Sequence, residues 1–492
     1  MHATPHEDSG VARRSRCSET SLADHETSAA TEEEVDLIPE IRDEDDGLSK
    51  EFVTVIRTAL EDDDVDLLRA ATEDLHEADL GDLIEALPAD DQGKLVRSLG
   101  ADFDFTALTE LDETVRVRIL EDLPPEQVAR GVSELDSDDA VYILEDLDEP
   151  DKTAILNEMP FPERVQLQRS LDYPEDSAGR RMQTDFIAVP PFWTVGQTID
   201  YLRDADELPD EFYEIFVVDP TFRLLGTVSL SHLMRAKRPT KISELTDETR
   251  NLVEVTDDQE EVAHLFERYN LVSAAVVDDA ERLVGVMTID DIVDVIREEA
   301  DEDFKLMAGV GDEEVSDSIV SSVRSRFPWL VVNLGTAILA SLVIGLFDAT
   351  IEQMVALAVL MPIVASMGGN AATQTMTIAV RALATRELDI YNARRLIGRE
   401  TVVGFVNGVL FALIIGLVAG LWFANAQLGG VIAAAMLVNL LVAGVSGILI
   451  PIGLDKLEVD PAVASGVFVT TVTDVVGFFA FLGFAAWWFG LG

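Results

Sequence analysis

The hydrophobic pattern of the chain changes near Pro328: short apolar stripes alternate with acidic residues before it, and long apolar runs follow it. A run of about 20 apolar residues has the length that crosses a bilayer as a helix. Buried helices of one large soluble core rarely give several such runs in succession, so the pattern predicts about five membrane spans. The predicted spans are 330–347, 355–380, 401–423, 428–454 and 462–490.

Basic residues are distributed unevenly around these spans. The loops at 348–354 and 424–427 contain no Lys or Arg, whereas the other side of the spans carries Arg324, Arg326, Arg381, Arg386, Arg394, Arg395 and Arg399. Lys and Arg close to a span are retained in the cytoplasm. With an odd number of crossings, we expect a multi-pass protein of the cell membrane with its N-terminus in the cytoplasm and its C-terminus outside.

The first residues, 1–47, are rich in Ser, Thr, Glu and Asp and contain few apolar groups. Such a segment cannot bury enough apolar surface to fold, so we expect a disordered acidic tail. The only cysteine, Cys17, lies in this tail and can form no intrachain disulfide, as expected in a reducing compartment.

A leucine or methionine then recurs about every twelve residues, which is the mark of a structural repeat. Pro or Asp often follows it, as in LPADD and LPPEQ, and can start the next short helix. The recurring positions are Leu75, Leu87, Leu99, Leu111, Leu123, Leu135, Leu147, Met159 and Leu171. The period predicts a small α-solenoid over 48–175, which would bind a partner surface or form a structural shell rather than catalyse a reaction.

A second internal repeat occupies 176–300. One copy contains IFVVD followed by RLLGTVSLSHLM, and the other contains AAVVDD followed by RLVGVMTIDDIV. Each copy reads as strand, helix, strand, turn, strand and helix. With V-V-D before the turn and L-x-G after it, the pattern resembles a tandem pair of CBS domains, a regulatory α/β module.

A single carboxylate, Asp474, lies near the middle of the last predicted span. A charge at this depth costs several kcal/mol, so such residues line a pathway or pair with a partner. The middle of the other spans offers no Lys or Arg, and we therefore favour the pathway. Gly477 and Gly483 in the same span fit a pathway or, equally, close helix packing.

The second predicted span contains MPIVASMGGNAATQT. Pro362 removes a helix hydrogen bond, and Gly368 and Gly369 loosen the next turn. We expect an unwound segment that exposes backbone carbonyls to a hydrated cation, because such backbone is tolerated in a membrane only inside protein or beside water.

In this order, the acidic helical domain, the CBS pair and the motifs MGGNAATQ, DPAVASG and TTVTD resemble the MgtE magnesium transporter and channel family from residue 48 to the end. The resemblance implies a multidomain fold. Its parts are an α-solenoid N-domain (48–175), an α/β tandem CBS pair (176–300), a plug-like linking helix (301–327) and an all-α polytopic membrane domain (328–492).

The resemblance further implies a homodimer, with the second and fifth spans of both chains around a central pore and two copies of Asp474 facing each other. It places Asn370, Thr373 and Gly369 at the same site. Mg²⁺ takes hard oxygen ligands and loses water reluctantly, so carboxylates that contact its hydration shell suit it better than a dry cage.

For regulation, the resemblance implies that cytoplasmic Mg²⁺ bridges acidic faces of the N-domain, the CBS pair and the linking helix and closes the pore. The matching positions are Asp257, Asp291, Asp294, Glu299, Glu302 and Asp303. Asp138 and Asp139 of the solenoid could join them, although any acidic pair there fits as well. The competing explanation is solvation, because a net charge of −56 suggests a halophile protein whose cytoplasmic surfaces are acidic throughout.

Other classes of function fit less well. An enzyme is not indicated, because the six His are scattered and no Ser-His-Asp or P-loop pattern occurs. A CBS-bearing chloride channel would need more spans and would prefer hydrogen-bond donors over a pore carboxylate. A Na⁺- or H⁺-coupled divalent-cation exchanger stays open as the alternative, as do Mn²⁺ and Co²⁺ as ions. An adenine nucleotide at the CBS pair has no support in the sequence, and no nucleic acid partner is indicated.

Overall fold

The computed structural model describes residues 38–43, 47–205, 208–209, 212–247, 252–311, 313, 319–386, 388, 390–457 and 459–490, with backbone alone at 390–391 and 463–465. Most of the predicted disordered tail, including Cys17, lies outside the described residues. The chain divides into two compact units, Met1–Phe103 and Asp104–Gly492.

The first unit is built from short amphipathic helices, namely α2 (Lys50–Glu61), α3 (Val65–Thr72), α4 (Glu77–Ala86) and α5 (Ala89–Leu99), with a 3₁₀ turn η1 (Gly100–Asp102). Side-chain caps fix where the first two begin: Ser49 accepts from the Phe52 amide and Asp64 from the Leu67 amide. Each helix turns an apolar stripe inward, as Phe52 and Ile56 of α2 show.

The second unit opens with more short helices, which are η2 (Phe105–Leu108), α6 (Glu113–Asp122), α7 (Pro125–Val132), α8 (Ser137–Glu145), α9 (Glu149–Glu158) and α10 (Phe161–Leu171). Pro lies in the first turn of α7, α9 and α10, where its missing N–H costs nothing. The repeat positions Leu111, Leu123, Leu147 and Met159 are buried. The predicted succession of short helices with a leucine core is confirmed.

Two small α/β repeats follow. The first contains β1 (Ala188–Val189), α12 (Val195–Asp204), β2 (Glu214–Val218), β3 (Leu224–Ser229) and α13 (Leu230–Arg235); the second contains β4 (Val253–Glu254), α14 (Gln259–Tyr269), β5 (Ser273–Val277), β6 (Leu283–Thr288) and α15 (Ile289–Met307). Each sheet has a parallel pair followed by an antiparallel pair, in the orders β1-β2-β3 and β4-β5-β6. The identical topology confirms the predicted duplication.

The segment predicted as a linking helix, 301–327, contains the end of one helix and the beginning of another. Helix α15 carries on from the second repeat to Met307, and α16 (Ile319–Gly345) begins well before the predicted first span. The backbone at 308–311 between them is not helical. Helix α15 itself is therefore continuous from the second CBS repeat to Met307, and non-helical backbone follows it before α16.

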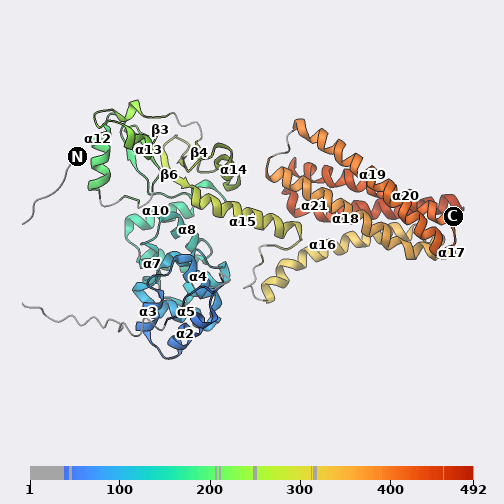
Figure 1. Ribbon diagram of the computed structural model, residues 1–492, viewed down its shortest axis with the longest axis horizontal. Helices are drawn as coiled ribbons and strands as arrows, with labels where there is room; N and C mark the ends of the chain where they lie inside the picture. The colour runs from blue at the N-terminus through green and yellow to red at the C-terminus, as the bar shows by residue number, and fades with distance from the viewer. Residues whose placement is uncertain are drawn as a thin grey trace, which may run out of the picture. The chain divides into compact units, whose positions relative to one another are not determined.

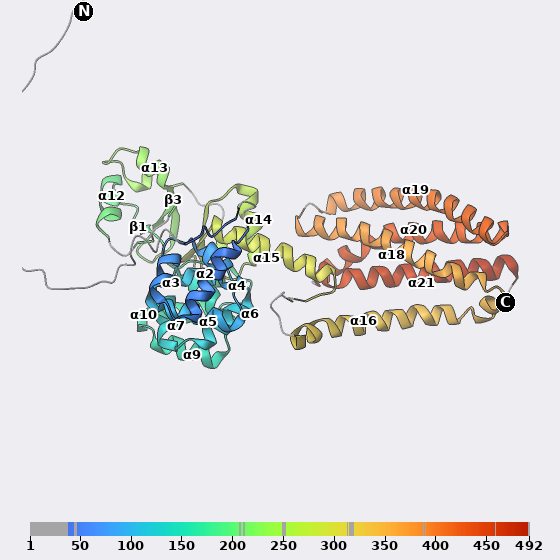
Figure 2. The same cartoon turned by 60° about the horizontal axis from the view of Figure 1, so that its bottom comes forward.

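Among the residues that the structure describes, five helices are long and apolar enough to cross a membrane, which confirms the predicted number of about five. They are α16, α18 (Ala356–Ala384), α19 (Ile390–Trp422), α20 (Ala426–Asp455) and α21 (Pro461–Phe489), and a short helix α17 (Asp348–Gln353) joins the first two. Figures 1 and 2 show these five long helices running side by side. Of the five, α20 is the most buried and α16 the least.

The expected unwound segment in the second span is wrong. Helix α18 continues through Pro362, Gly368 and Gly369 without interruption. A proline inside a helix removes one hydrogen bond, and in a membrane bundle neighbouring helices can compensate for it. Gly368 packs against α20 instead of loosening a turn.

Candidate functional site

Asp474 lies half-buried at the middle of α21, among apolar residues and a run of threonines. The hydroxyls of Thr470, Thr471 and Thr473 donate to backbone carbonyls of their own helix. Helix α21 packs along α18 through a cluster that includes Ala372, Met376 and Val469. The structure therefore places Asp474 on the helix that lies beside the MGGNAATQ segment.

A stripe of polar residues follows one exposed face of α18. Ser366, Asn370, Thr373 and Thr377 recur at intervals of three or four residues and are all exposed in the single chain. The Asn370 side chain donates to the Ser366 hydroxyl at 3.4 Å. Gly369 beside them is half-buried, and a Cβ there would meet open space. A polar face on a membrane helix belongs against water or protein, because lipid satisfies none of its hydrogen bonds.

A second carboxylate lies within a membrane helix. Glu400 of α19 is buried, accepts from the Thr375 hydroxyl of α18 at 3.4 Å and lies 3.5 Å from Nε of Arg399. The sequence interpretation missed it because the third span was expected to begin at residue 401, whereas α19 begins at Ile390.

No group of three or more His, Cys, Asp and Glu side chains is close enough to hold a metal ion within the described part of the chain. A dry, multi-carboxylate cage is therefore not part of these residues. Mg²⁺ usually keeps several waters and is held by one or two carboxylates, so isolated and paired carboxylates are the relevant sites to examine.

Asp138 and Asp139, on the first turn of α8, face Asp291 on the first turn of α15. Burial, together with the nearby carboxylates of Asp291, Asp136, Asp290 and Asp294, raises the pKa of Asp139 to about 7. Burial likewise raises the pKa of Asp138 and of Asp291, the latter to about 6. Oδ1 of Asp138 is buried and has no hydrogen-bond partner among the described residues. The structure thus brings together an acidic pair that the sequence could not single out and one predicted sensor residue.

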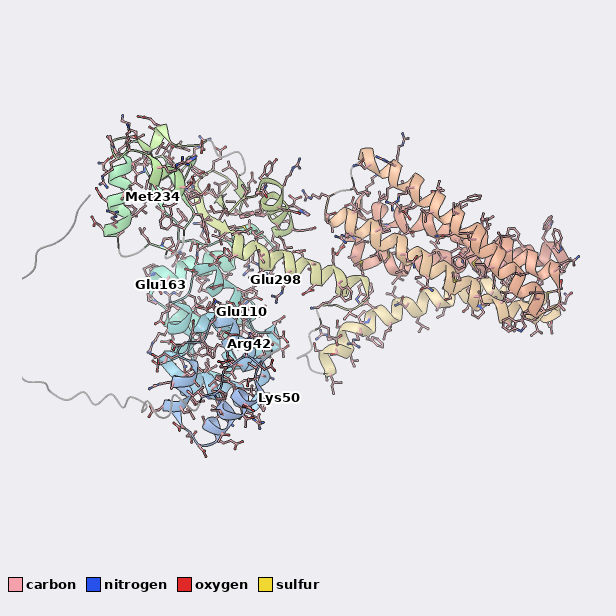
Figure 3. All side chains as sticks on the ribbon, viewed as in Figure 1. Arg42, Lys50, Glu110, Glu163, Met234 and Glu298 are labelled. Carbon is pink, nitrogen blue, oxygen red and sulfur yellow. The ribbon has the colours of Figure 1, made fainter. Side chains whose placement is uncertain are left out.

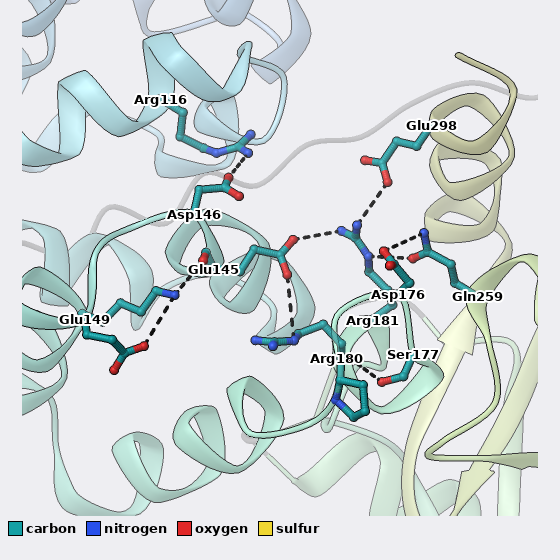
Figure 4. Close-up of polar contacts among 12 residues, drawn as sticks. Arg116, Glu145, Asp146, Glu149, Asp176, Ser177, Arg180, Arg181, Gln259 and Glu298 are labelled. Carbon is teal, nitrogen blue, oxygen red and sulfur yellow. Dashed lines mark hydrogen bonds and ion pairs between the residues drawn. The ribbon is translucent and has the colours of Figure 1, made fainter. Parts of the chain in front are cut away.

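The opposite end of α8 is held by a fixed cation. Arg181 lies 3.3 Å from Oε1 of Glu145 on α8 and 3.1 Å from Oε2 of Glu298 on α15. Its Nε also donates to Gln259 on α14 at 3.1 Å (Figure 4). Glu298 is labelled on α15 in Figure 3. One end of the α8–α15 contact therefore has its charges balanced, while the other end collects carboxylates.

Two further predicted sensor residues lie along α15. Glu299 accepts from Nε2 of Gln259 at 2.8 Å, yet burial and the nearby Glu260 and Glu302 raise its pKa to about 7. Burial raises the pKa of Asp303 to about 6, with Asp460 and Glu260 adding to the shift.

Asp460 lies between the C-terminal part of α15 and helix α21, which carries Asp474. It is the N-cap of α21 and accepts from the Ala462 amide at 2.7 Å. The last turn of α15, through Leu306 and Met307, packs on the beginning of the same helix. A change near Asp303, at the C-terminal end of α15, can therefore act directly on the helix that carries Asp474.

The remaining predicted sensor residues lie in other surroundings. Asp257 accepts from the Glu254 amide at 2.8 Å and so shapes a turn, while Asp294 and Glu302 are exposed on α15. Arg181 and Asp460 were missed by the sequence interpretation, although Asp460 stands in the DPAVASG motif.

Comparisons with known proteins cover most of the chain. Family models match as a divalent cation transporter over 361–484, an MgtE intracellular N domain over 75–176 and CBS domains over 178–238 and 242–298. Proteins named magnesium transporter MgtE from Bacillus subtilis (strain 168) and Enterococcus faecalis are 35% and 36% identical over 312 residues, which are 63% of this chain and 69% of each relative. A solved structure described as the cytosolic domain of the Mg²⁺ channel MgtE in complex with ATP is 30% identical, with a TM-score of 0.46, and covers 49% of this chain and 99% of that one.

Five membrane helices with a carboxylate at mid-depth, joined to a CBS pair and an acidic helical domain, define a polytopic transport protein with a cytosolic regulatory part. Within this class, the similarity to relatives over two thirds of their length identifies the family. The chain belongs to the MgtE family.

Proposed function

We propose that this chain takes up Mg²⁺ through a channel that passes Asp474. The observation that carries the proposal is the position of this carboxylate, half-buried at the middle of α21 and beside the helix with the polar stripe. The relatives named above are called magnesium transporters and not enzymes, which agrees with this function. Asn370, Thr373 and Gly369 of α18 complete the proposed path.

A second chain supplies the other wall of the path. One carboxylate per chain is a poor trap for a divalent ion, whereas two copies of Asp474 across a two-fold axis give two. The exposed stripe with Asn370 and Thr373 would meet lipid in a single chain, and a homodimer removes that cost. The ion keeps much of its water and contacts carboxylate, amide and hydroxyl oxygens through it.

Cytoplasmic Mg²⁺ closes this channel through the carboxylates of α15. The contact of Asp138 and Asp139 with Asp291 suits a hydrated divalent ion. The pKa values of Asp138 and Asp139 are raised, and the buried Oδ1 of Asp138 has no hydrogen-bond partner among the described residues. Glu299 and Asp303 extend the sensor toward Asp460 and the pore helix. Asp257, Asp294 and Glu302 are included among the proposed sensor residues because their positions match those that the family resemblance implies.

The domain limits 48–175, 176–300, 301–327 and 328–492 are part of the proposal, as are the cytoplasmic N-terminus, the external C-terminus and the halophile origin of the acidic surface. The ATP complex is a property of the related cytosolic domain, and an adenine nucleotide at the CBS pair of this chain stays an alternative without support in the sequence.

A coupled exchanger for Mg²⁺ against Na⁺ or H⁺ is the second candidate. The buried Glu400 favours it, because it gives the long apolar helices a carboxylate besides Asp474 for a coupled ion. Mn²⁺ and Co²⁺ are the alternative ions for either mechanism.

Growth rescue tests the proposed function. The wild-type chain should restore growth of magnesium-starved cells that lack other uptake systems, and Asp474→Ala should not, at equal membrane expression. Full rescue by Asp474→Ala would contradict a path through this carboxylate.

A further inference from the structure

Asn439, near the middle of α20, is a polar side chain that lies completely inside the bundle of described membrane helices. Its Nδ2 donates to the backbone carbonyl of Val364 on α18 at 2.8 Å. A carbonyl can only accept, so this bond also fixes which way the amide is turned. The bond ties α20 to α18 in the half of that helix that contains Pro362.

Two glycines from different helices enclose this amide. A Cβ added to Gly477 of α21 would come within 2.8 Å of the amide nitrogen of Asn439, and a Cβ added to Gly368 of α18 would overlap the same amide. Contacts below 3.0 Å require something to shift. The Asn439 amide therefore fills a slot whose two walls are the glycines of α18 and α21.

The oxygen of the same amide makes an asparagine at this position energetically unfavourable. Oδ1 of Asn439 is buried without a hydrogen-bond partner among the described residues. Leucine has the same branched shape and brings no polar atom into the bundle, so it would remove the cost of the unpaired oxygen. In several proteins a buried polar residue of this kind specifies one arrangement of helices over its alternatives.

The slot lies next to the proposed path on both sides. Gly368 is adjacent to Gly369 and two residues from Asn370, and Gly477 lies one helical turn from Asp474. We propose that Asn439 is a positioning residue that sets the spacing and register of α18 and α21, and through them the placement of Asn370 and Asp474. The proposal rests on the proposed conduction path for its effect on transport, and on the contacts of Asn439 for its effect on helix spacing.

A size-exchange series tests this role through Mg²⁺ flux into vesicles that contain purified protein. Asn439→Leu keeps the branching of the side chain and removes the bond, and should reduce flux about tenfold, within the range of coupling found for residues in contact. Gly477→Ala should reduce flux because its methyl group displaces the amide. Adding Asn439→Ala to Gly477→Ala frees that space, so the double variant should transport no worse than Asn439→Ala alone. Losses that multiply in the double variant would overturn the proposal.

Ser446→Ala is the matched control, because this buried hydroxyl on α20 donates at 3.4 Å to Ala443 of its own helix. It should keep wild-type flux. Equal flux in Asn439→Leu and wild type would show that Asn439 only fills space.

A distance measurement separates this inference from the proposed function. Spin labels at exposed Ile378 of α18 and Phe468 of α21, in a Cys17→Ser background diluted with unlabelled chain, report the spacing without any transport. Asn439→Leu should broaden or shift the distance distribution, and Ser446→Ala should leave it unchanged. An unchanged distribution in Asn439→Leu would refute the positioning role, whereas a wild-type chain that moves no Mg²⁺ would refute only the proposed function. Should Asn439→Leu fail to fold, the Gly477→Ala and double-variant pair supplies the same comparison.

Discussion

Removing one carboxylate from the α8–α15 contact should make that contact form without Mg²⁺. The perturbation is Asp139→Asn, which keeps the size of the side chain and deletes its charge. In the wild type, Asp139 lies half-buried near Asp291 and other carboxylates, and its ionised form opposes the contact. We therefore expect the variant to hold the contact at Mg²⁺ concentrations that leave the wild type open.

The magnitude follows from the pKa. A carboxyl whose pKa rises from 3.8 to about 7 on burial opposes the buried state by at most about 4 kcal/mol when ionised, since a tenfold change in proton affinity is about 1.4 kcal/mol. Part of the burial belongs to the helical domain itself, so about 2 kcal/mol is the expected gain for the contact in Asp139→Asn. That gain is a factor of about 30 in the ratio of closed to open forms.

The sign of the pH dependence follows from the same raised values. The closed contact binds more protons than the open one, so lowering the pH stabilises it. The opposition by Asp139 is absent below about pH 4 and complete above about pH 7. In EDTA, the wild-type contact should therefore tighten as the pH falls from 8 toward 5, and Asp139→Asn should flatten this response.

Hydrogen–deuterium exchange at α8 and the first turn of α15 provides the assay. Protection should appear in Asp139→Asn without Mg²⁺, while Glu163→Gln, which removes an exposed carboxylate from α10 (Figure 3), should behave as wild type. Identical Mg²⁺ dependence of protection in Asp139→Asn and wild type would refute the reasoning.

Three further predictions concern other parts of the account. Arg181→Met leaves Glu145 and Glu298 without their cation and should lower the stability of the cytosolic region by about 2 kcal/mol in chemical denaturation, whereas exposed Arg130→Met should have no effect. Thr373→Cys in a Cys17→Ser background should crosslink into a dimer, unlike Leu413→Cys on the exposed face of α19; equal crosslinking would argue against the proposed interface. The last compares two fourfold neutralisations, of Asp291, Asp294, Glu299 and Glu302 or of Glu32, Glu33, Glu34 and Asp36. At 1 M KCl, where the Debye length is about 3 Å, only the first should remove the dependence of the open probability on cytoplasmic Mg²⁺, and equal responses would favour surface solvation.

The membrane helices could be predicted because hydropathy is a property of consecutive residues. Their limits were less certain, since a helix can continue through polar residues beyond an apolar run, as α19 does by beginning at Ile390. Glu400 was missed for this reason. The prediction of an unwound segment at Gly368 was wrong because a glycine is compatible with both a flexible backbone and close helix packing. The contact of Gly368 with Asn439 shows that close packing applies here.

The acidic contacts show a different limit of sequence interpretation. The sequence predicted a helix at the end of the second repeat, and α15 confirms this helix, which carries Asp291, but a chain this acidic offers many partners for it. Asp138 and Asp139 became distinct only when the structure placed α8 against α15. Arg181 likewise joins Glu145 and Glu298, which are far apart in sequence, and no local pattern announces such a bridge.

Single-channel recording tests the central claim, that Mg²⁺ passes Asp474, most directly. Purified wild-type protein in a planar bilayer, with Mg²⁺ as the only permeant cation, should give unitary currents. Asp474→Asn should abolish them, and Asp455→Asn, which removes an exposed carboxylate from the end of α20, should preserve them. Unitary Mg²⁺ currents of wild-type size in Asp474→Asn, or Mg²⁺ flux in vesicles without any unitary current in the wild type, would contradict the account.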